Sequence, residues 1–241
     1  MHNMTFEQIR IELAEISVNI KVRHREIAYL CDGYLAEYNK PADISVCVSE
    51  TEIDQELSIS GNRHSRGYCE TVCVYREIAE KLPFFDRFVF HGAAVSCGGR
   101  GVIFAAPSGV GKSTHVKLWK ECFGDEIKVI NGDKPIVGAS DGKIFVYGSP
   151  WSGKEGWNCN ASAELQSICV VRRGEKNRIF EIDPREYFDE IVRQIYIPKN
   201  GEALAKTFDI LDEISQKVKF YLLECDVSKE AAHLSFNTLL K

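Results

Sequence analysis

The sequence has few of the features that would place it in a specialised class of protein. No stretch approaches the ~18 consecutive apolar residues that a membrane-spanning helix needs, and residues 1–15 mix charged and apolar side chains instead of forming the apolar core of a signal peptide. No run of lysines or arginines provides the basic surface of a nucleic-acid-binding protein. These absences predict a cytoplasmic protein that binds neither membrane nor nucleic acid.

The cysteines do not form the spacings that bind metals or pair into a disulfide framework. Nine are present, with no Cys-x-x-Cys pair among them. Cys69 and Cys73, four residues apart, could share a helix face, but no histidine lies close enough in sequence to complete a zinc site. We therefore expect free thiols and no structural metal. The full set is Cys31, Cys47, Cys69, Cys73, Cys97, Cys122, Cys159, Cys169 and Cys225.

What remains is an ordinary globular composition, with 44% hydrophobic and 27% charged residues in a chain of 241 and a net charge of -5. The length is sufficient for one main domain with a small addition. We find no internal repeat and no low-complexity linker. Near residue 85 the hydrophobic pattern changes to strand-like runs that alternate with helices. This change predicts a small N-terminal α/β lobe over residues 1–84 and a larger domain over residues 85–241.

Hydrophobic periodicity predicts the elements of both parts. Alternating residues over Phe6–Leu13 and Ile16–Val22 predict a hairpin, and a third strand follows at 44–48. Apolar residues three and four apart predict a helix over Tyr68–Leu82, which Pro83 terminates. In the larger part we predict strands at Val89–Val95, Gly101–Ala105, Lys128–Ile130, Lys143–Tyr147, Gln166–Val171 and Lys219–Glu224, and helices at Ser113–Phe123, Pro184–Tyr196, Glu202–Ser215 and Lys229–Leu240.

The most informative motif lies between the strand ending at Ala105 and the helix that begins near Lys112. It matches the phosphate-binding (Walker A) pattern Gly-x-x-x-x-Gly-Lys-Ser/Thr, except that Ala106 takes the place of the first glycine. Such a loop directs backbone N–H groups at phosphate oxygens, its lysine reaches the β- and γ-phosphates, and its hydroxyl binds Mg²⁺. The motif predicts an ATP site with Mg²⁺, formed by Ser108, Gly109, Val110, Gly111, Lys112, Ser113 and Thr114.

Two further residues are candidates for the chemistry. Asp133 follows the strand Lys128–Ile130, which could return beside the loop in a parallel sheet, and a carboxylate there would bind metal or accept a proton. The alternative is a capping aspartate in a turn, because Asn-Gly-Asp is good turn chemistry. His91 stands among apolar residues next to Gly92. Taken alone it is a core histidine, although the predicted hairpin could bring it near the loop.

Each of the remaining candidates has two interpretations. The loop from Gly148 to Asn158, rich in glycine and tryptophan, could form a lid from which Lys154 reaches phosphate, or it could be an anchored surface loop. Arg172 and Arg173 could stabilise transition-state charge, or they could form a solvated strand end.

Taken together, His91-Gly92, the hairpin, Ser108-Gly109-Val110-Gly111-Lys112-Ser113 and the strand ending before Asp133 resemble the C-terminal domain of the HPr kinase/phosphorylase family. The fold of that family is similar to that of the phosphoenolpyruvate carboxykinases. The run 132–136 with 148–153 looks like small stand-alone members of bacterial genomes, some of which modify peptides. The resemblance implies that Lys112 holds phosphates, Ser113 and Asp133 bind magnesium, and Asp133 with His91 serves proton transfer. It also implies a homo-oligomer.

Two departures from the family pattern bear on activity. The family carries two adjacent acidic residues where this chain has Gly132-Asp133, and residues 1–84 do not resemble its usual N-terminal domain. We expect an α/β fold with a central mixed sheet and an ATP- and Mg²⁺-dependent kinase that phosphorylates a serine-like hydroxyl of a peptide, protein or small molecule. The alternative is a non-catalytic ATP-binding module, and a carboxykinase acting on oxaloacetate is disfavoured by the short chain.

Overall fold

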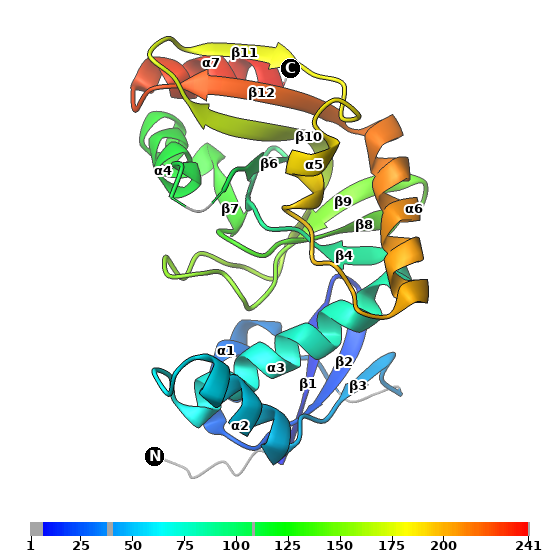
Figure 1. Cartoon of the computed structure of the whole chain (residues 1–241). Coiled ribbons are helices and arrows are strands. Elements are labelled where there is room, and N and C mark those ends of the chain that lie inside the picture. Colours follow the sequence, from blue (N-terminus) through cyan, green and yellow to red (C-terminus); the bar gives the residue numbers. More distant parts are fainter. Residues whose placement is uncertain (1–6, 38–40, 108, 241) are drawn as a thin grey trace.

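The protein has a mixed α/β architecture, seen in a computed structural model that describes residues 7–37, 41–107 and 109–240 (Figure 1). Within these residues the strands form two sheets, one of three strands and one of nine. In the same residues, every helix is too short or too polar to cross a bilayer. The expectation of an α/β protein with a central mixed sheet is confirmed.

The smaller sheet lies at the N-terminal end of the chain. Strand β1 (Gln8–Leu13) pairs antiparallel with β2 (Ile16–Lys21), and β3 (Ile44–Val46) pairs parallel with β2, so the predicted hairpin and third strand are confirmed. Its helices are α1 (Arg25–Leu30), the 3-10 turn η1 (Asp32–Tyr34), α2 (Glu50–Ile59), α3 (Arg66–Lys81) and the 3-10 turn η2 (Leu82–Phe85). Pro83 lies in η2, which agrees with its predicted role in ending the long helix.

The larger sheet is mixed and forks at one long strand. Its main path runs β4 (Arg87–Val89), β8 (Ile136–Ser140), β9 (Lys143–Tyr147), β10 (Ser162–Arg173), β6 (Arg100–Ala105), β5 (Ala93–Cys97) and β7 (Lys128–Asn131). Strand β12 (Lys219–Cys225) also pairs with β10, and β11 (Arg178–Glu181) pairs with β12. Because β6, β10 and β12 are mutually parallel, their carboxyl ends meet at one edge of the sheet.

Helices cover both faces of this sheet (Figure 1). Helix α4 (Lys112–Phe123) continues into the 3-10 turn η3 (Gly124–Glu126) and packs with α7 (Lys229–Leu239) on one face, around the fully buried Trp119. Helices α5 (Phe188–Val192) and α6 (Gly201–Lys217) pack on the other face. The result is a three-layer core of helix, sheet and helix, which exposes the ends of the strands between the helical layers.

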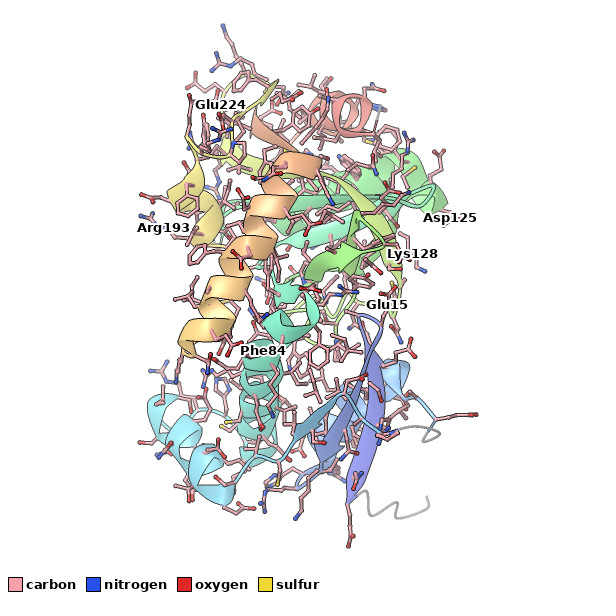
Figure 2. The ribbon with its side chains drawn as sticks, turned by 90° about the vertical axis from the view of Figure 1, so that its right-hand side faces the viewer. Glu15, Phe84, Asp125, Lys128, Arg193 and Glu224 are labelled. Carbon is pink, nitrogen blue, oxygen red and sulfur yellow. The ribbon has the colours of Figure 1, made fainter. Side chains whose placement is uncertain are left out.

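The hairpin of the smaller sheet docks directly on the larger one. Its two-residue turn holds Ala14 at φ 52° and Glu15 at φ 67°. There the Glu15 carboxylate accepts hydrogen bonds from Arg87 at 2.9 Å, Tyr147 at 3.2 Å and Ser140 at 3.3 Å. Figure 2 shows Glu15 at this junction and Phe84 in η2, beside α6. One apolar cluster crosses the same junction, and the division at residue 85 stays a prediction.

Three local predictions are wrong. The strand predicted over Val89–Val95 is interrupted at Phe90–Gly92, and its two halves pair with different strands, β8 and β6. The helix predicted over Pro184–Tyr196 is reduced to α5, because residues 194–196 instead bond along residues 89–91. Strand β7 does not lie beside β6, since β5 is inserted between them and is antiparallel to both.

Candidate functional site

The first part of the site is the turn between β6 and α4, which we call the glycine loop (residues 106–111). Strand β6 ends at the buried Ala105, and Ala106, the first residue of the loop, is buried too. Gly109 has φ +81° and Gly111 has φ +132°, backbone angles that residues other than glycine rarely adopt. Gly111 is the N-cap of α4, so the unpaired N–H groups of the first helical turn open toward the loop. This geometry suits an anion at the helix N-terminus. Ser108 lies outside the described residues.

The lysine of the motif is folded back onto the loop. Lys112 is 8% exposed, and its Nζ donates a hydrogen bond to the Ala106 carbonyl at 2.6 Å. Burial lowers the pKa of Lys112, and the charge of Asp133 partly offsets this effect. Among the described residues, the hydrogen-bond partner of this ammonium is that one carbonyl. A buried ammonium gains from an anion within reach, because a charge removed from water is costly unless it is paired.

The second part of the site is a charged cluster beyond the end of β7. His91 Nε2 lies 3.3 Å from Asp133 Oδ1, and Lys134 Nζ lies 3.3 Å from Asp133 Oδ2. The contact with His91, with Lys134 adding to it, lowers the pKa of Asp133 to about 2. The His91 side chain is 34% exposed and lines the same cavity as the loop, so it is a hydrogen-bonded histidine near the loop and not one enclosed in the core.

The break in the predicted strand explains how His91 reaches this position. The Gly92 N–H donates to the Asp133 carbonyl at 3.0 Å, which draws the chain toward the end of β7. A Cβ at Gly92 would lie 2.7 Å from Ile103 and 3.0 Å from the Phe104 carbonyl. Only glycine fits there without displacing β6, so the His-Gly pair follows from close packing.

Asn131 is a supporting residue that sequence reasoning missed. It is fully buried at the end of β7, and its Oδ1 accepts the N–H groups of Asp133 at 2.8 Å and Lys134 at 2.7 Å. Its amide nitrogen donates to the Ser149 carbonyl at 2.9 Å. The Asn-Gly-Asp run contained the signal, because such a turn is an asparagine side chain capping the next backbone groups. Here the turn serves to orient the aspartate.

The tryptophan-rich loop packs against this turn, and we call residues 151–158 the covering loop. The Gly132 N–H donates to the Trp157 carbonyl at 2.8 Å, and a Cβ at Gly132 would lie 3.2 Å from the Ser152 carbonyl. A second acidic side chain at position 132 would thus have to displace the loop. Gly153 approaches Asp133 so closely that its own Cβ would lie 3.0 Å from the Asp133 Cβ.

The two arginines that end β10, Arg172 and Arg173, have separate partners. Arg173 donates to the carbonyls of Gly109 at 2.8 Å and Val110 at 3.1 Å, so it braces the glycine loop from the outside. Arg172 pairs with Glu190 of the segment containing α5. The side chains of both arginines are thereby held at the carboxyl end of β10.

Two of the cavities at the glycine loop share residues of the loop and of the start of α4. One, of about 520 Å³, brings together the loop, the start of α4 and the charged cluster; it is lined by residues that include His91, Lys112, Ser113, Asp133, Lys154 and Glu155. The other, of about 390 Å³, lies over the carboxyl ends of β10 and β12 and is lined by residues that include Val110, Leu118, Arg173, Asp226 and Val227. Gly109, Gly111 and Thr114 line both.

The residues of the larger cavity fit a magnesium ion held together with phosphate. The Ser113 hydroxyl and the Asp133 carboxylate, which line this cavity, are the oxygens that would hold it, and Mg²⁺ in nucleotide sites is held by one or two protein oxygens plus phosphates and water. Among the described residues no group of three or more histidine, cysteine or acidic side chains forms a ready metal cage. The donor set therefore suits a metal that enters with a phosphate ligand.

Comparison with known proteins adds little to this geometry. No protein-family model matches the chain, and no curated protein matches it. Among the solved structures that match is the HPr(Ser) kinase/phosphatase from Coxiella burnetii, at 10% sequence identity and a TM-score of 0.37. That match covers 63% of this chain and 87% of the other.

Proposed function

We propose that the protein is an ATP- and Mg²⁺-dependent kinase that transfers the γ-phosphoryl group to a serine-like hydroxyl. The observation that carries this proposal is the meeting, in one cavity, of a helix N-terminus with its lysine and a histidine–aspartate pair. The loop and Lys112 are suited to phosphate, and Asp133 is suited to metal and to the acceptor. In this proposal the glycine loop is the phosphate-binding loop of an HPr-kinase-like fold.

The two cavities favour one orientation of the nucleotide. The groups that can act on a phosphoryl group line the larger cavity, so the γ-phosphate and acceptor would occupy it. The nucleoside would then extend across the loop into the smaller cavity, where Val110, Leu118 and Val227 offer apolar surface. Ligands of open α/β sheets bind outside the carboxyl ends of parallel strands, which is where both cavities lie.

The transfer step follows from these placements. The acceptor oxygen forms a bond to the γ-phosphorus, the bond from that phosphorus to the bridging oxygen breaks, and ADP leaves. Bound Mg²⁺ would neutralise charge on the β- and γ-phosphate oxygens. Lys112 stabilises the charge that develops on the transferred group, and Asp133 receives the hydroxyl proton. A carboxylate with a pKa of about 2 is a weak base, which suffices when the proton leaves late in a loose transition state.

The decisive experiment compares Asp133→Asn with wild type in ATP binding and in transfer of labelled γ-phosphate to a panel of hydroxyl acceptors, including serine peptides. We expect transfer to fall by about 10²-fold or more while nucleotide binding persists. Lys112→Met should weaken nucleotide binding itself. Asp125→Asn and Lys120→Met, which alter exposed residues of the same region, are the matched controls. Full transfer by Asp133→Asn would refute the role of Asp133.

A second function is favoured by one specific contact. The Trp151 indole N–H donates to the Thr71 carbonyl at 3.0 Å, so the covering loop joins the Asp133 turn to helix α3. A non-catalytic ATP-binding module would use this connection to signal nucleotide state to a partner. Tight ATP binding with no turnover on any acceptor, together with an ATP-dependent partner, would establish this alternative in place of the kinase.

A further inference from the structure

Gln194 occupies a position opposite His91 that the proposed chemistry does not yet use. The segment after α5 runs along the break between β4 and β5: the His91 N–H donates to the Gln194 carbonyl at 2.5 Å, and the Tyr196 N–H donates to the Val89 carbonyl at 2.9 Å. Phe90 and Ile195 form a bridge between these two bonds. Gln194 is 7% exposed. Its backbone is therefore fixed, and its side chain must find partners inside the protein.

Two of those partners are backbone carbonyl oxygens, which can only accept. With the amide oriented so that its nitrogen faces them, Nε2 of Gln194 lies 3.2 Å from each of three atoms: the His91 carbonyl oxygen, the Ala106 carbonyl oxygen and His91 Nδ1. The opposite orientation would set the amide oxygen against these acceptors. Buried polar groups are satisfied in folded proteins, so the donor orientation is the one that the surroundings require.

A donor at Nδ1 determines the tautomer of the histidine. A neutral imidazole carries one proton, and the nitrogen that accepts a hydrogen bond cannot hold it. Because the amide nitrogen that faces Nδ1 is a donor, and the Asp133 Oδ1 that faces Nε2 at 3.3 Å is an acceptor, a neutral ring carries its proton on Nε2. Neutral His91 then acts as a donor to Asp133, and only the aspartate of the pair keeps lone pairs free for an incoming proton.

The third partner of Gln194 ties the histidine to the glycine loop. The Ala106 carbonyl also accepts from Lys112 Nζ at 2.6 Å. When Lys112 turns toward a phosphate, that carbonyl loses its cation and keeps the amide of Gln194 as a donor. The same side chain therefore contacts both the first residue of the loop and the ring of His91.

We infer that Gln194 is a positioning residue that holds His91 in the Nε2–H tautomer and couples it to the glycine loop through Ala106. The inference rests on the proposed kinase function for its consequence in catalysis, but the tautomer itself can be measured on the protein alone. In catalysis, the loss of Gln194 should lower kcat more than it raises the KM for ATP, because the amide touches neither nucleotide nor acceptor and reaches the glycine loop only through the Ala106 carbonyl. A decrease of about tenfold to a hundredfold is expected for a misplaced catalytic group.

The test is a long-range proton–nitrogen NMR spectrum of the full chain labelled with ¹⁵N-histidine, with the His91 signals identified by their absence in His91→Gln. We expect the wild-type protein at neutral pH to show protonated Nε2 and unprotonated Nδ1. Gln194→Met, which keeps the length but removes the donor, should give a mixture of tautomers. Gln194→Glu, which offers only acceptors, should place a proton on Nδ1.

Gln166→Met, at a partly buried amide on β10 away from the site, is the matched control and should leave the His91 signals unchanged. A proton on Nδ1 in the wild-type spectrum would overturn the inference even if every variant failed to fold, and so would an unaltered tautomer in a folded Gln194→Met. If the protein transfers no phosphoryl group, the proposed function fails while the spectra still decide the role of Gln194.

Discussion

At the scale of single residues, His115 on the inner face of α4 shows how burial sets a titration. The ring is 2% exposed, and its Nε2 lies 2.8 Å from the Ser235 hydroxyl on α7. Trp119 donates to the same hydroxyl at 2.8 Å, and that hydroxyl in turn donates to the Ala232 carbonyl at 3.0 Å. Burial lowers the pKa of His115 to about 4. Since the Ser235 proton is used on Ala232, this hydroxyl accepts from His115 Nε2–H, and burial disfavours a second proton on the ring.

This shift predicts a defined pH dependence of stability. Between pH 6.5, the ordinary pKa of histidine, and about pH 4, His115 is protonated in the unfolded chain but not in the folded chain. The unfolding free energy therefore falls as pH falls through this window, by about 3 kcal/mol in total, and levels off below it. Urea unfolding at pH 7.5 and pH 4.5 measures the change. His115→Gln should lose this pH-dependent part of the stability, whereas His233→Gln, at an exposed position, should keep it. If the unfolding free energy changes equally between the two pH values in both variants, the assignment to His115 is contradicted.

The residues of the site divide into those that a motif reveals and those that only packing reveals. Lys112, Ser113 and the glycines belong to a pattern with a known physical purpose, and Asp133 follows a strand after the next helix. Asn131 and Gln194 belong to no such motif, and their side chains reach the site because the fold places their backbone beside it. Gln194 reaches the site because residues 194–196 pair with residues 89–91, a contact across a hundred residues that no local pattern encodes.

At the scale of elements, strands and helices with a strong period were predictable and the irregular ones were not. The hairpin, the helix after the glycine loop, β9 and β12 agree with their apolar patterns. Strand β8 was missed because Ile136–Ser140 has only a short apolar run that includes Gly138, which lies against Arg87 and allows no side chain. The predicted helix over residues 184–196 failed because a tertiary pairing competes with its local preference.

The covering loop gives a prediction at this scale. Gly153→Ala introduces a Cβ at φ +73° that would lie 3.0 Å from the Asp133 Cβ, while Gly156→Ala introduces one at φ +66° with no atom within 4 Å. Both variants should lose about 1 kcal/mol of stability from backbone strain. Only Gly153→Ala should also shift the Asp133 turn and lower phosphoryl transfer. Thermal unfolding and transfer rates of the pair measure this, and equal transfer rates would show that the loop does not act on Asp133.

At the scale of the whole molecule, helix α3 connects the smaller sheet to the segments that carry the site. Its Tyr75 ring lies 5.6 Å below Lys134 Nζ and packs on Trp151 and Tyr196. One turn further on, the Glu80 carboxylate accepts the Tyr196 hydroxyl at 3.0 Å and the Lys199 N–H at 3.0 Å. The smaller sheet and its helices thus support both the Asp133 turn and the strand-like segment that bears Gln194.

We predict that Glu80→Ala loosens that segment. The loss of these hydrogen bonds to a charged acceptor should cost about 2 kcal/mol of stability. It should also speed amide hydrogen exchange in residues 195–200, measured by mass spectrometry. Glu77→Ala, which removes only a surface pair with Lys81 on the same helix, is the control and should leave that exchange unchanged. Identical exchange in the two variants would show that α3 does not hold the segment.

The insertion of β5 between β6 and β7 sets a distance as well as a topology. Adjacent strands lie about 4.8 Å apart, so the ends of β6 and β7 are separated by roughly twice that. The ammonium at the start of α4 and the carboxylate beyond β7 consequently do not neutralise each other through contact; Lys112 bonds to a carbonyl instead. The sheet keeps a cation and an anion facing each other across a gap, and the field between them acts on whatever polar group enters it.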